Sequence, residues 1–457
     1  MRAKISLSIG ILLVLSLGGC ATVQPVQPES HFEAVQTLGQ ERVQTEIVWS
    51  QDAEQVQENF QRAYTLAQDG LTRDEAAHIA ILNNRSLQAE LENLGLAAAE
   101  LTQAGLLQNP ILEAFVAFPL SVGSSGLGLI GWLSDLWQVP RRKRVAALAA
   151  RQAEYTAAWH VMLTAYTAAH AWDAVVATRQ LLRIEQELLV VRGKAAQRLK
   201  IRYGHGLADT TEMEETVSMQ ARQEIAVHEA KQAVTQAVTL LAQTLALDNA
   251  ADFIPTHTLE TIPFEQQSLQ VILQYAMDNR LDLAIAHAEV ERRVKQHELE
   301  RALIWKTVLF GPGWEGDFED VAGGKNSIGP TLSIELPIFD QKQAGIAASS
   351  YQLRQAIRRL EALQRLVAKE VVEHYRGLDR IHAALLILEN TLLPSTDTSV
   401  NYAQEWNHKM QLPFITVLAE QVHQLEVQRR IVQTRKMLND TWRMLQLARL
   451  GASPHMP

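Results

Sequence analysis

The chain holds few residues whose type and spacing could support catalysis. It contains one cysteine and neither a GxSxG nor an HExxH motif. Lys325 follows two glycines, but the earlier glycine and the following hydroxyl of a phosphate-binding loop are missing. The side chains of His205, His408 and Met410 are of the kind that suits copper, which permits a metal-relay hypothesis. No histidine pair has the close helical spacing of a metal site, so we expect these three side chains to be ordinary surface residues. We therefore expect the protein to hold no metal and no cofactor and not to be an enzyme.

The amino-terminal residues predict a secreted lipoprotein. A basic start precedes an apolar run over residues 5–17, which is too short to span a bilayer and has the length of a signal peptide. The run ends in the letters LGGC, which resemble a bacterial lipobox. Residues 1–19 would then be the signal peptide and Cys20 the lipidated first residue. Ala21, in place of Asp, favours sorting to the outer membrane; a plain signal peptide with an incidental cysteine is the alternative.

The composition favours long helices and argues against several classes of protein. Hydrophobic residues make up 47% of the chain and aromatic residues only 6%, which suits helices and coiled coils better than an α/β enzyme. The net charge is −9, opposite to the basic surface of a nucleic-acid-binding protein, so we expect no nucleic acid partner. Beyond the leader, no uncharged apolar stretch is long enough for a spanning helix. Any membrane crossing would therefore use the strands of a closed barrel.

A repeated segment organises the chain. The letters ILNNRSLQA around Asn84 and AMDNRLDLA around Asn279 share an Asn-Arg pair, 195 residues apart (279 − 84 = 195). Each copy is followed by a helix, a strand pair and two very long helices. This tandem duplication predicts a mainly α protein with a small β part. We assign residues 54–250 to the first repeat, 251–267 to a linker and 268–450 to the second repeat.

The remaining residues flank the two repeats. Residues 20–53 contain proline and many glutamines, and we expect them to form an extended, poorly packed, lipidated arm. Residues 451–457 would be a short tail.

Within the first repeat, the pattern is helical from residue 54 to about residue 108. Thr72 and Glu75 have the spacing of a capping box, which predicts a helix start there. The predicted elements that follow are a strand pair over residues 111–136 and long helices over 140–203 and 211–247.

Heptad spacing in the first long helix predicts coiled-coil-like packing against neighbouring helices. Some 60 residues would span roughly 90 Å at about 1.5 Å per residue. The heptad residues are Leu148, Tyr155, Met162, Ala169 and Val176.

The second repeat is predicted to have a helix from about residue 268. A strand pair over 305–338 and long helices over 341–406 and 414–450 follow. In its last strand, Thr331, Ser333 and Glu335 alternate with apolar residues, which is typical of a transmembrane barrel strand with its polar side toward the lumen.

The order of these features resembles the TolC-like outer membrane efflux family, in its lipoprotein branch, over nearly the whole mature chain. The matching segments are Leu71 to Asn84, Asn279 to Leu283, Leu336 to Asp340, Tyr203 to Gly206, and Val417-Leu418. The resemblance implies a homotrimer in which each protomer gives four strands to one shared twelve-stranded outer-membrane barrel. Long helices would form a tunnel across the periplasm. A periplasmic adaptor (membrane fusion protein) and an inner-membrane transporter would be its partners.

The two breaks between long helices are the candidate periplasmic tip. They contain Gly204, Gly206 and Asp209 in the first repeat, and Met410 and Pro413 in the second. The resemblance implies that acidic residues such as Asp209 help to constrict a closed pore. The alternative for Asp209 is a helix N-cap. The second break departs from the family in lacking a glycine.

Aromatic and basic residues near the strand ends are candidates for contact with outer-membrane lipid. Trp132, Trp137, Trp305 and Trp314 could form an interfacial girdle. The basic run over residues 141–144 could bind lipid phosphate or could be a solvated first helical turn.

Two functions follow from this sequence. The first is a passive outer-membrane exit duct of a tripartite efflux or secretion system. The second is a non-channel periplasmic coiled-coil lipoprotein, acting as an adaptor or scaffold. Two helical hairpins and barrel-type strands favour the duct.

Overall fold

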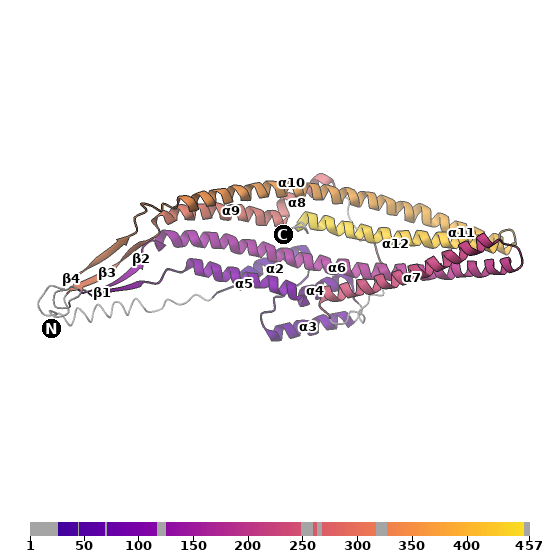
Figure 1. Cartoon of the computed structure of the whole chain (residues 1–457), viewed down its shortest axis with the longest axis horizontal. Coiled ribbons are helices and arrows are strands. Elements are labelled where there is room, and N and C mark those ends of the chain that lie inside the picture. Colours follow the sequence, from indigo (N-terminus) through magenta and orange to yellow (C-terminus); the bar gives the residue numbers. More distant parts are fainter. Residues whose placement is uncertain are drawn as a thin grey trace.

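The computed structural model is a long, narrow molecule with a sheet at one end and helical hairpins at the other (Figure 1). It describes residues 26–43, 45–68, 71–116, 125–247, 259–262, 267–316 and 327–451. The signal peptide, Cys20, most of the predicted linker and the tail beyond Gly451 lie outside the described residues. None of the helices in the described ranges is both long enough and apolar enough to cross a bilayer.

The same order of elements occurs twice, as the repeat predicts. Two helices come before α4 in the chain: α2 (Glu29–Val43) and α3 (Ala53–Gln68). The first repeat continues with α4 (Arg73–Asn83), α5 (Arg85–Gly105), β1 (Ile111–Val116), β2 (Ser125–Trp132), α6 (Asp135–Gly204) and α7 (Thr210–Leu245). The second has α8 (Leu269–Asn279), α9 (Leu281–Ala302), a short 3-10 turn (Leu303–Trp305), β3 (Val308–Gly316), β4 (Ser327–Ile334), α10 (Gln343–Ile387), a π-turn (Leu388–Leu392), α11 (Leu393–His408) and α12 (Phe414–Leu450).

The two repeats align with an offset of 196 residues, not the predicted 195. Asn83 and Asn279 end α4 and α8 (279 − 83 = 196), so Asn84 and Arg280 occupy equivalent junctions. Both junction residues donate their backbone N–H to an alanine carbonyl of the preceding helix. Matching the shared Asn-Arg letters gives the wrong offset, because the equivalent junction residues of the two repeats differ in type: one is Asn84 and the other is Arg280.

The predicted start of α4 is confirmed. Thr72 accepts a hydrogen bond from the Glu75 N–H, and the Glu75 carboxylate accepts one from the Thr72 N–H (2.8 Å), which is a complete capping box. The range predicted as helical, from residue 54 to about 108, is divided into α3, α4 and α5 by this start and by the junction at Asn84, which was not predicted.

The arm predicted as extended is wrong for its described part. Helix α2 begins directly after Pro28, whose carbonyl accepts from the Phe32 N–H. Val35 is completely buried against α6, and Gly39 allows Ile47 to pack closely on the helix. The prolines and glutamines suggested a loose segment, but the prolines precede the helix and the apolar residues have helical spacing.

Several predicted boundaries also shift. The strands are shorter than residues 111–136 and 305–338, because α6 begins at Asp135 and the 3-10 turn holds Trp305. Helix α6 contains Pro140 in its second turn, although the sequence placed the helix start there. Helix α12 coincides with the predicted range 414–450.

The second long helix, predicted over residues 341–406, is interrupted. Pro394 has no N–H to donate, and the preceding Leu393 N–H bonds to the Leu388 carbonyl, which widens this turn into a π-turn. Helix α6 has 70 residues and no such turn, so it spans about 105 Å. The two repeats therefore differ in the continuity of their longest helices.

Candidate functional site

The four strands form one antiparallel sheet in the order β1-β2-β3-β4. Strands β2 and β3 pair across the two repeats, with Leu127 opposite Trp314 and Gly131 opposite Phe310. Since directly opposed residues project to the same side of a sheet, this register defines two faces.

One face of the sheet is apolar and bare. Side chains on this face are well exposed in the single chain, for example Leu112 at 67% and Ile328 at 81%. Such a contiguous apolar surface marks a site of contact with lipid or protein. From the register, its members include Leu112, Ala114, Leu127, Leu129, Phe310, Pro312, Trp314, Ile328, Pro330, Leu332 and Ile334.

The opposite face is rich in glycine and polar side chains. Gly311 is needed there, because a Cβ at this position would lie 2.0 Å from the Leu129 carbonyl oxygen. Phe115 covers Gly126 on the same face. The small and polar members of this face are Glu113, Gly126, Gly128, Gly311, Gly313, Glu315, Ser327, Gly329, Thr331 and Ser333.

The sequence placed Thr331, Ser333 and Glu335 on one polar side of the last strand. Thr331 and Ser333 lie in β4 on the glycine-rich face. Glu335 follows the end of β4 and is held by Thr307, whose Oγ1 donates to the Glu335 Oε2 at 2.6 Å. The Glu335 N–H also donates to the Thr307 carbonyl at 3.0 Å, which continues the β3–β4 register by one residue, so all three residues lie on the same side.

The four tryptophans are divided between the two ends of the sheet. Trp132 ends β2 and donates to the Asn109 carbonyl at 3.2 Å, while Trp137 and Trp305 lie in the helical turns beside it. Trp314 lies on the apolar face near the other end of β3. Trp137 and Trp305 were predicted in or beside strands; the structure places them in helical turns.

The basic run over residues 141–144 lies inside α6 close to this junction. Arg142 donates to the Leu106 carbonyl at 3.1 Å and reaches Asp135 at 3.5 Å. Asp135 is buried and also accepts from the Gln108 N–H at 2.6 Å. Arg142 is therefore partly used to fasten the end of α5 to the start of α6.

The two tips have the same backbone design. In the first, residues 205–209 join α6 to α7; in the second, residues 409–413 join α11 to α12. The Gly206 N–H donates to the Tyr203 carbonyl (2.9 Å), and the Met410 N–H donates to the Asn407 carbonyl (2.8 Å). Gly206 has a φ of 71° and Met410 a φ of 58°. Met410 thus takes the left-handed position that glycine fills in the first tip, which explains how the second break forms without one.

Residues after these positions begin the return helices. Asp209 is the N-cap of α7 and accepts from the Glu212 N–H at 2.8 Å, so the capping role considered for it is present. Pro413 is the N-cap of α12. Gly204 is the last residue of α6. His205 and His408 flank the turns, and no group of three or more His, Cys, Asp or Glu side chains suited to a metal occurs among the described residues.

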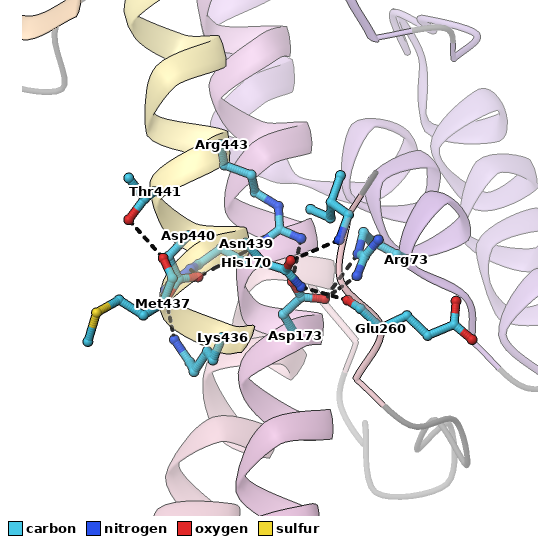
Figure 2. Close-up of polar contacts among 11 residues, drawn as sticks. Arg73, His170, Asp173, Glu260, Lys436, Met437, Asn439, Asp440, Thr441 and Arg443 are labelled. Atoms are coloured by element: carbon cyan, nitrogen blue, oxygen red, sulfur yellow. Dashed lines mark hydrogen bonds and ion pairs between the residues drawn. The ribbon is translucent and has the colours of Figure 1, made fainter. Parts of the chain in front are cut away.

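A buried ionic cluster between the repeats was not predicted. Asp173 of α6 is completely buried and accepts from the Arg73 Nε at 3.0 Å and from Arg443 of α12 at 2.5 Å. Figure 2 shows Arg73, Asp173, Asn439 and Arg443 converging between the helices. Asn439 also donates to the Glu260 carbonyl at 2.9 Å. The cluster joins both repeats and the described part of the linker, and a lone Asp in the apolar run AHAWDAVVA was its only sequence signal.

Next to this cluster lies a second group of ionic side chains, which is more exposed to solvent. Asp440 accepts from Lys436 at 2.6 Å and lies 2.8 Å from the His170 Nδ1 (Figure 2). Burial opposes ionisation of Asp440, but the hydrogen bonds from His170 and Lys436 outweigh it and hold its pKa below the ordinary value. The stability from this carboxylate is therefore present at neutral pH and is lost only as the pH falls through that lowered pKa.

The junction residues of the two repeats satisfy the ends of the return helices. Asn84 donates to the Thr244 carbonyl at 3.3 Å at the end of α7. Arg280, which is 1% exposed, donates to the Ala448 carbonyl at 2.8 Å at the end of α12. Arg280 is also paired with Asp282 (2.9 Å) and Glu370 (2.7 Å). In the first repeat the Asn83 amide also donates, to the Leu245 and Ala246 carbonyls at 3.1 and 2.7 Å, so side chains at the junction fasten the end of the return helix in each repeat.

Comparison with solved structures shows that several outer membrane channels share this fold. No family model and no curated protein sequence matches the chain. The fold is the mainly helical arrangement with a four-stranded antiparallel sheet that the resemblance to TolC-like channels predicted, and this prediction is confirmed.

Three solved structures illustrate the similarity. The outer membrane protein VceC from Vibrio cholerae is 14% identical, with a TM-score of 0.67 over 85% of this chain and 98% of that one. The CmeC outer membrane channel of Campylobacter jejuni is 13% identical, with a TM-score of 0.65 over 92% of this chain and 93% of that one. The open state of the Neisseria gonorrhoeae MtrE outer membrane channel is 13% identical, with a TM-score of 0.66 over 82% of this chain and 88% of that one.

Removing the central carboxylate of the ionic cluster should destabilise the protein strongly. Asp173→Ala leaves the buried Arg443 and the partly buried Arg73 without this carboxylate, and we expect a loss of about 3–5 kcal/mol in the free energy of unfolding. Urea unfolding followed by circular dichroism measures this. Glu229→Ala, which removes an exposed carboxylate from α7, is the control and should change little. Equal midpoints for both variants would contradict the assigned role of the cluster.

Substitutions at the two tips should have opposite effects. Met410→Gly removes the strain of a left-handed residue that carries a side chain, and Gly206→Ala introduces that strain. We expect the first variant to stabilise its tip and the second to destabilise its tip by about 1 kcal/mol, which corresponds to roughly fivefold slower and fivefold faster amide hydrogen exchange there. Gly193→Ala inside α6 has open space around it and should instead stabilise its helix. Faster exchange around residue 410 in Met410→Gly would refute the strain argument.

Proposed function

We propose that this protein is the outer-membrane channel, or exit duct, of a tripartite efflux or secretion system. It passes substrates passively from the periplasm to the exterior. The observation that carries the proposal is the sheet with one bare apolar face and one glycine-rich polar face, set at one end of a ribbon of long helices. The shared fold with solved outer membrane channels supports it.

The open edges of the chain support a homotrimer. The sheet ends in β1 on one side and β4 on the other. An unpaired edge is not tolerated in lipid, and four strands cannot close on themselves. Three copies, joined β4 to β1, would form a shared twelve-stranded barrel, which is wide enough for a water-filled lumen. Thr331, Ser333 and Glu335 would then line the lumen.

The apolar face would meet the lipid. Strand β4 has its apolar residues between Ile328 and Ile334. Six residue steps of about 3.3 Å give about 20 Å, close to the apolar band of about 25 Å in barrels of this kind. Trp314, on the apolar face near one end of the sheet, and Trp137 and Trp305, in the helical turns at the other end, would contribute to two interfacial girdles, whereas Trp132 lies on the glycine-rich face by its register and would face the lumen.

The helices would carry the duct through the periplasm. The tips at 204–209 and 409–413 lie at the end of the molecule opposite the sheet (Figure 1). They are the part of the chain that a periplasmic adaptor linked to an inner-membrane transporter would meet. Energy would come from that transporter.

A lipid on Cys20 would fit this placement. Nine residue steps separate Cys20 from Glu29 (29 − 20 = 9), which can span about 30 Å. His31 contacts Glu154, nineteen residues along α6 from Asp135 (154 − 135 = 19), or about 29 Å. A lipid anchor would therefore reach the level at which the strands begin, where the inner leaflet of the outer membrane would lie.

The second candidate is a non-channel lipoprotein acting as a periplasmic coiled-coil adaptor or scaffold. Its support is the large helical content and the exposed tips. It leaves the bare apolar face of the sheet and the two unpaired strand edges without a purpose. The two candidates differ in whether the purified protein conducts ions.

Single-channel recording in planar bilayers tests the proposal. We expect discrete conductance steps that are larger or more frequent for Asp209→Ala than for the native protein, because the tip loses an acidic group and a helix cap. Asp209→Ser keeps a capping oxygen and removes only the charge. A leak in both variants assigns the constriction to the charge, and a leak in the alanine variant alone assigns it to the cap. Absence of steps from all three proteins, shown beforehand to be trimeric, would favour the scaffold.

A further inference from the structure

Helix α10 carries a row of basic residues on the side turned away from the rest of the chain. Successive members are separated alternately by four and seven residues, which keeps them on one face of a helix. The buried residues of α10, such as Ala356, Val367, Val371 and Leu378, lie on the opposite side. The row consists of Arg354, Arg358, Arg365, Lys369, Arg376 and Arg380. We call it the basic row of α10.

The basic row is exposed and stands out in a chain with a net charge of −9. The Arg358 side chain is 81% exposed, although it contacts Glu361 at 2.9 Å. Tyr351, next to the row and 66% exposed, lies under the Arg354 guanidinium at 4.5 Å. This side of α10 is therefore a solvent-exposed basic surface with an aromatic side chain at its end nearer the sheet.

The basic row lies on one open edge of the helical ribbon. Packing between neighbouring helices follows the order α5, α6, α9, α10 in the half nearer the sheet. Helix α10 is therefore the outer helix on the β4 side, and α5 is the outer helix on the β1 side. In any ring of copies joined head to tail, α10 of one copy faces α5 of the next.

The outer face of α5 is acidic where α10 is basic. Its buried residues, including Leu87, Leu91 and Leu94, face α6. Glu90 and Glu100 lie on its remaining surface together with Leu96, which is 63% exposed, while Glu92, also exposed, accepts a hydrogen bond from the Trp49 Nε1 of the same chain at 3.0 Å.

Contacts between adjacent helices show that these two surfaces lie at the same level. Arg293 of α9 bonds Gln352 of α10 at 2.8 Å. One turn away on α9, Glu289 bonds Gln152 of α6 at 3.1 Å.

The level of Gln152 on α5 follows from two further contacts of α6. Lys143 lies beside Gly105, and His160 lies 3.8 Å from Glu90. Gln152 lies between them in sequence. The half of the basic row nearer the sheet, from Arg354 to Arg365, is therefore at about the same height along the long axis as the part of α5 between Glu90 and Gly105.

We propose that the basic row of α10 docks against the acidic outer face of α5 in a second copy of this chain, and that this ion-pair seam sets the vertical register of the assembled ring. A rotation about the long axis preserves level, so the charges that match within one chain also match between copies. The inference rests on the proposed homotrimer and adds the contact that aligns its members. Exposed apolar side chains, Leu96 on one edge and Tyr351 on the other, are buried by the same contact.

Charge exchange tests the seam. The variant Arg354→Glu/Arg365→Glu and the variant Glu90→Arg/Glu100→Arg each place like charges across the contact, because Arg354 is level with Glu100 and Arg365 with Glu90. We expect each to lower the ratio of trimer to monomer in detergent at low salt by about tenfold or more, because several surface pairs change sign at every interface. The combined variant restores opposite charges and should recover the native ratio. Multi-angle light scattering after size exclusion measures the ratio.

Two controls keep the result specific. Lys295→Glu/Arg301→Glu makes the same charge change on α9, which is an inner helix of the ribbon, and should leave the trimer intact. Since Cys20 is the only cysteine, Arg354→Cys with Glu100→Cys, which lie at the same level, should give cross-linked dimers and trimers on oxidation of a lipidated protein.

A trimer unaffected by either charge reversal, or a combined variant no better than the single ones, would overturn the seam. If the native protein still forms conducting trimers in that case, the channel proposal stands and only the seam fails. If the native protein neither trimerises nor conducts, the channel proposal itself fails.

Discussion

The structure depends on one constraint: in the single chain, both the sheet and the layer of helices have edges without a neighbour. The sheet stops at β1 and β4, and the helices nearer the sheet stop at α5 and α10. Backbone hydrogen-bonding groups at a strand edge must be satisfied, and in a nonpolar environment no solvent can do so. All the edges of one side lie on one long boundary of the molecule, so a single mode of association can satisfy them together. The two-faced sheet, the charge difference between α5 and α10 and the exposed apolar side chains are consistent with that one requirement.

The interior solves a different problem, which is to hold two repeats in register along a very long axis. Apolar packing between smooth helices permits sliding by a turn, whereas buried charges do not. Asp173 accepts from residues of α4 and α12, and Arg280 binds Asp282, Glu370 and a carbonyl of α12. Breaking such a pair costs more than its net contribution, because the remaining charge is left buried. These clusters therefore define one alignment and penalise its neighbours.

Local features of the fold were predictable from the sequence, and distant ones were not. The Thr72–Glu75 box, the alternation around Leu332 and the range of α12 depend on residues close together in the chain, where spacing carries the information. Asp173 and Arg443 are 270 residues apart, and no local pattern connects them. Met410 adopts a conformation that its residue type disfavours, imposed by the same turn that Gly206 forms easily. Helix α2 was missed because its composition was weighed and its apolar spacing was not.

The pairing of β2 with β3 has a consequence for the order in which the chain can fold. Gly131 and Phe310 are neighbours in the sheet but 179 residues apart in the chain (310 − 131 = 179). Contacts of this separation carry a large loop-closure cost and form late, whereas the α6–α7 hairpin and the α11–α12 hairpin are local. The apolar face of the sheet is therefore completed only after most of the helical part has been synthesised and can already be packed. Until that pairing forms, the apolar side chains of the sheet are divided between two separate hairpins, β1–β2 and β3–β4, neither of which presents the whole apolar face.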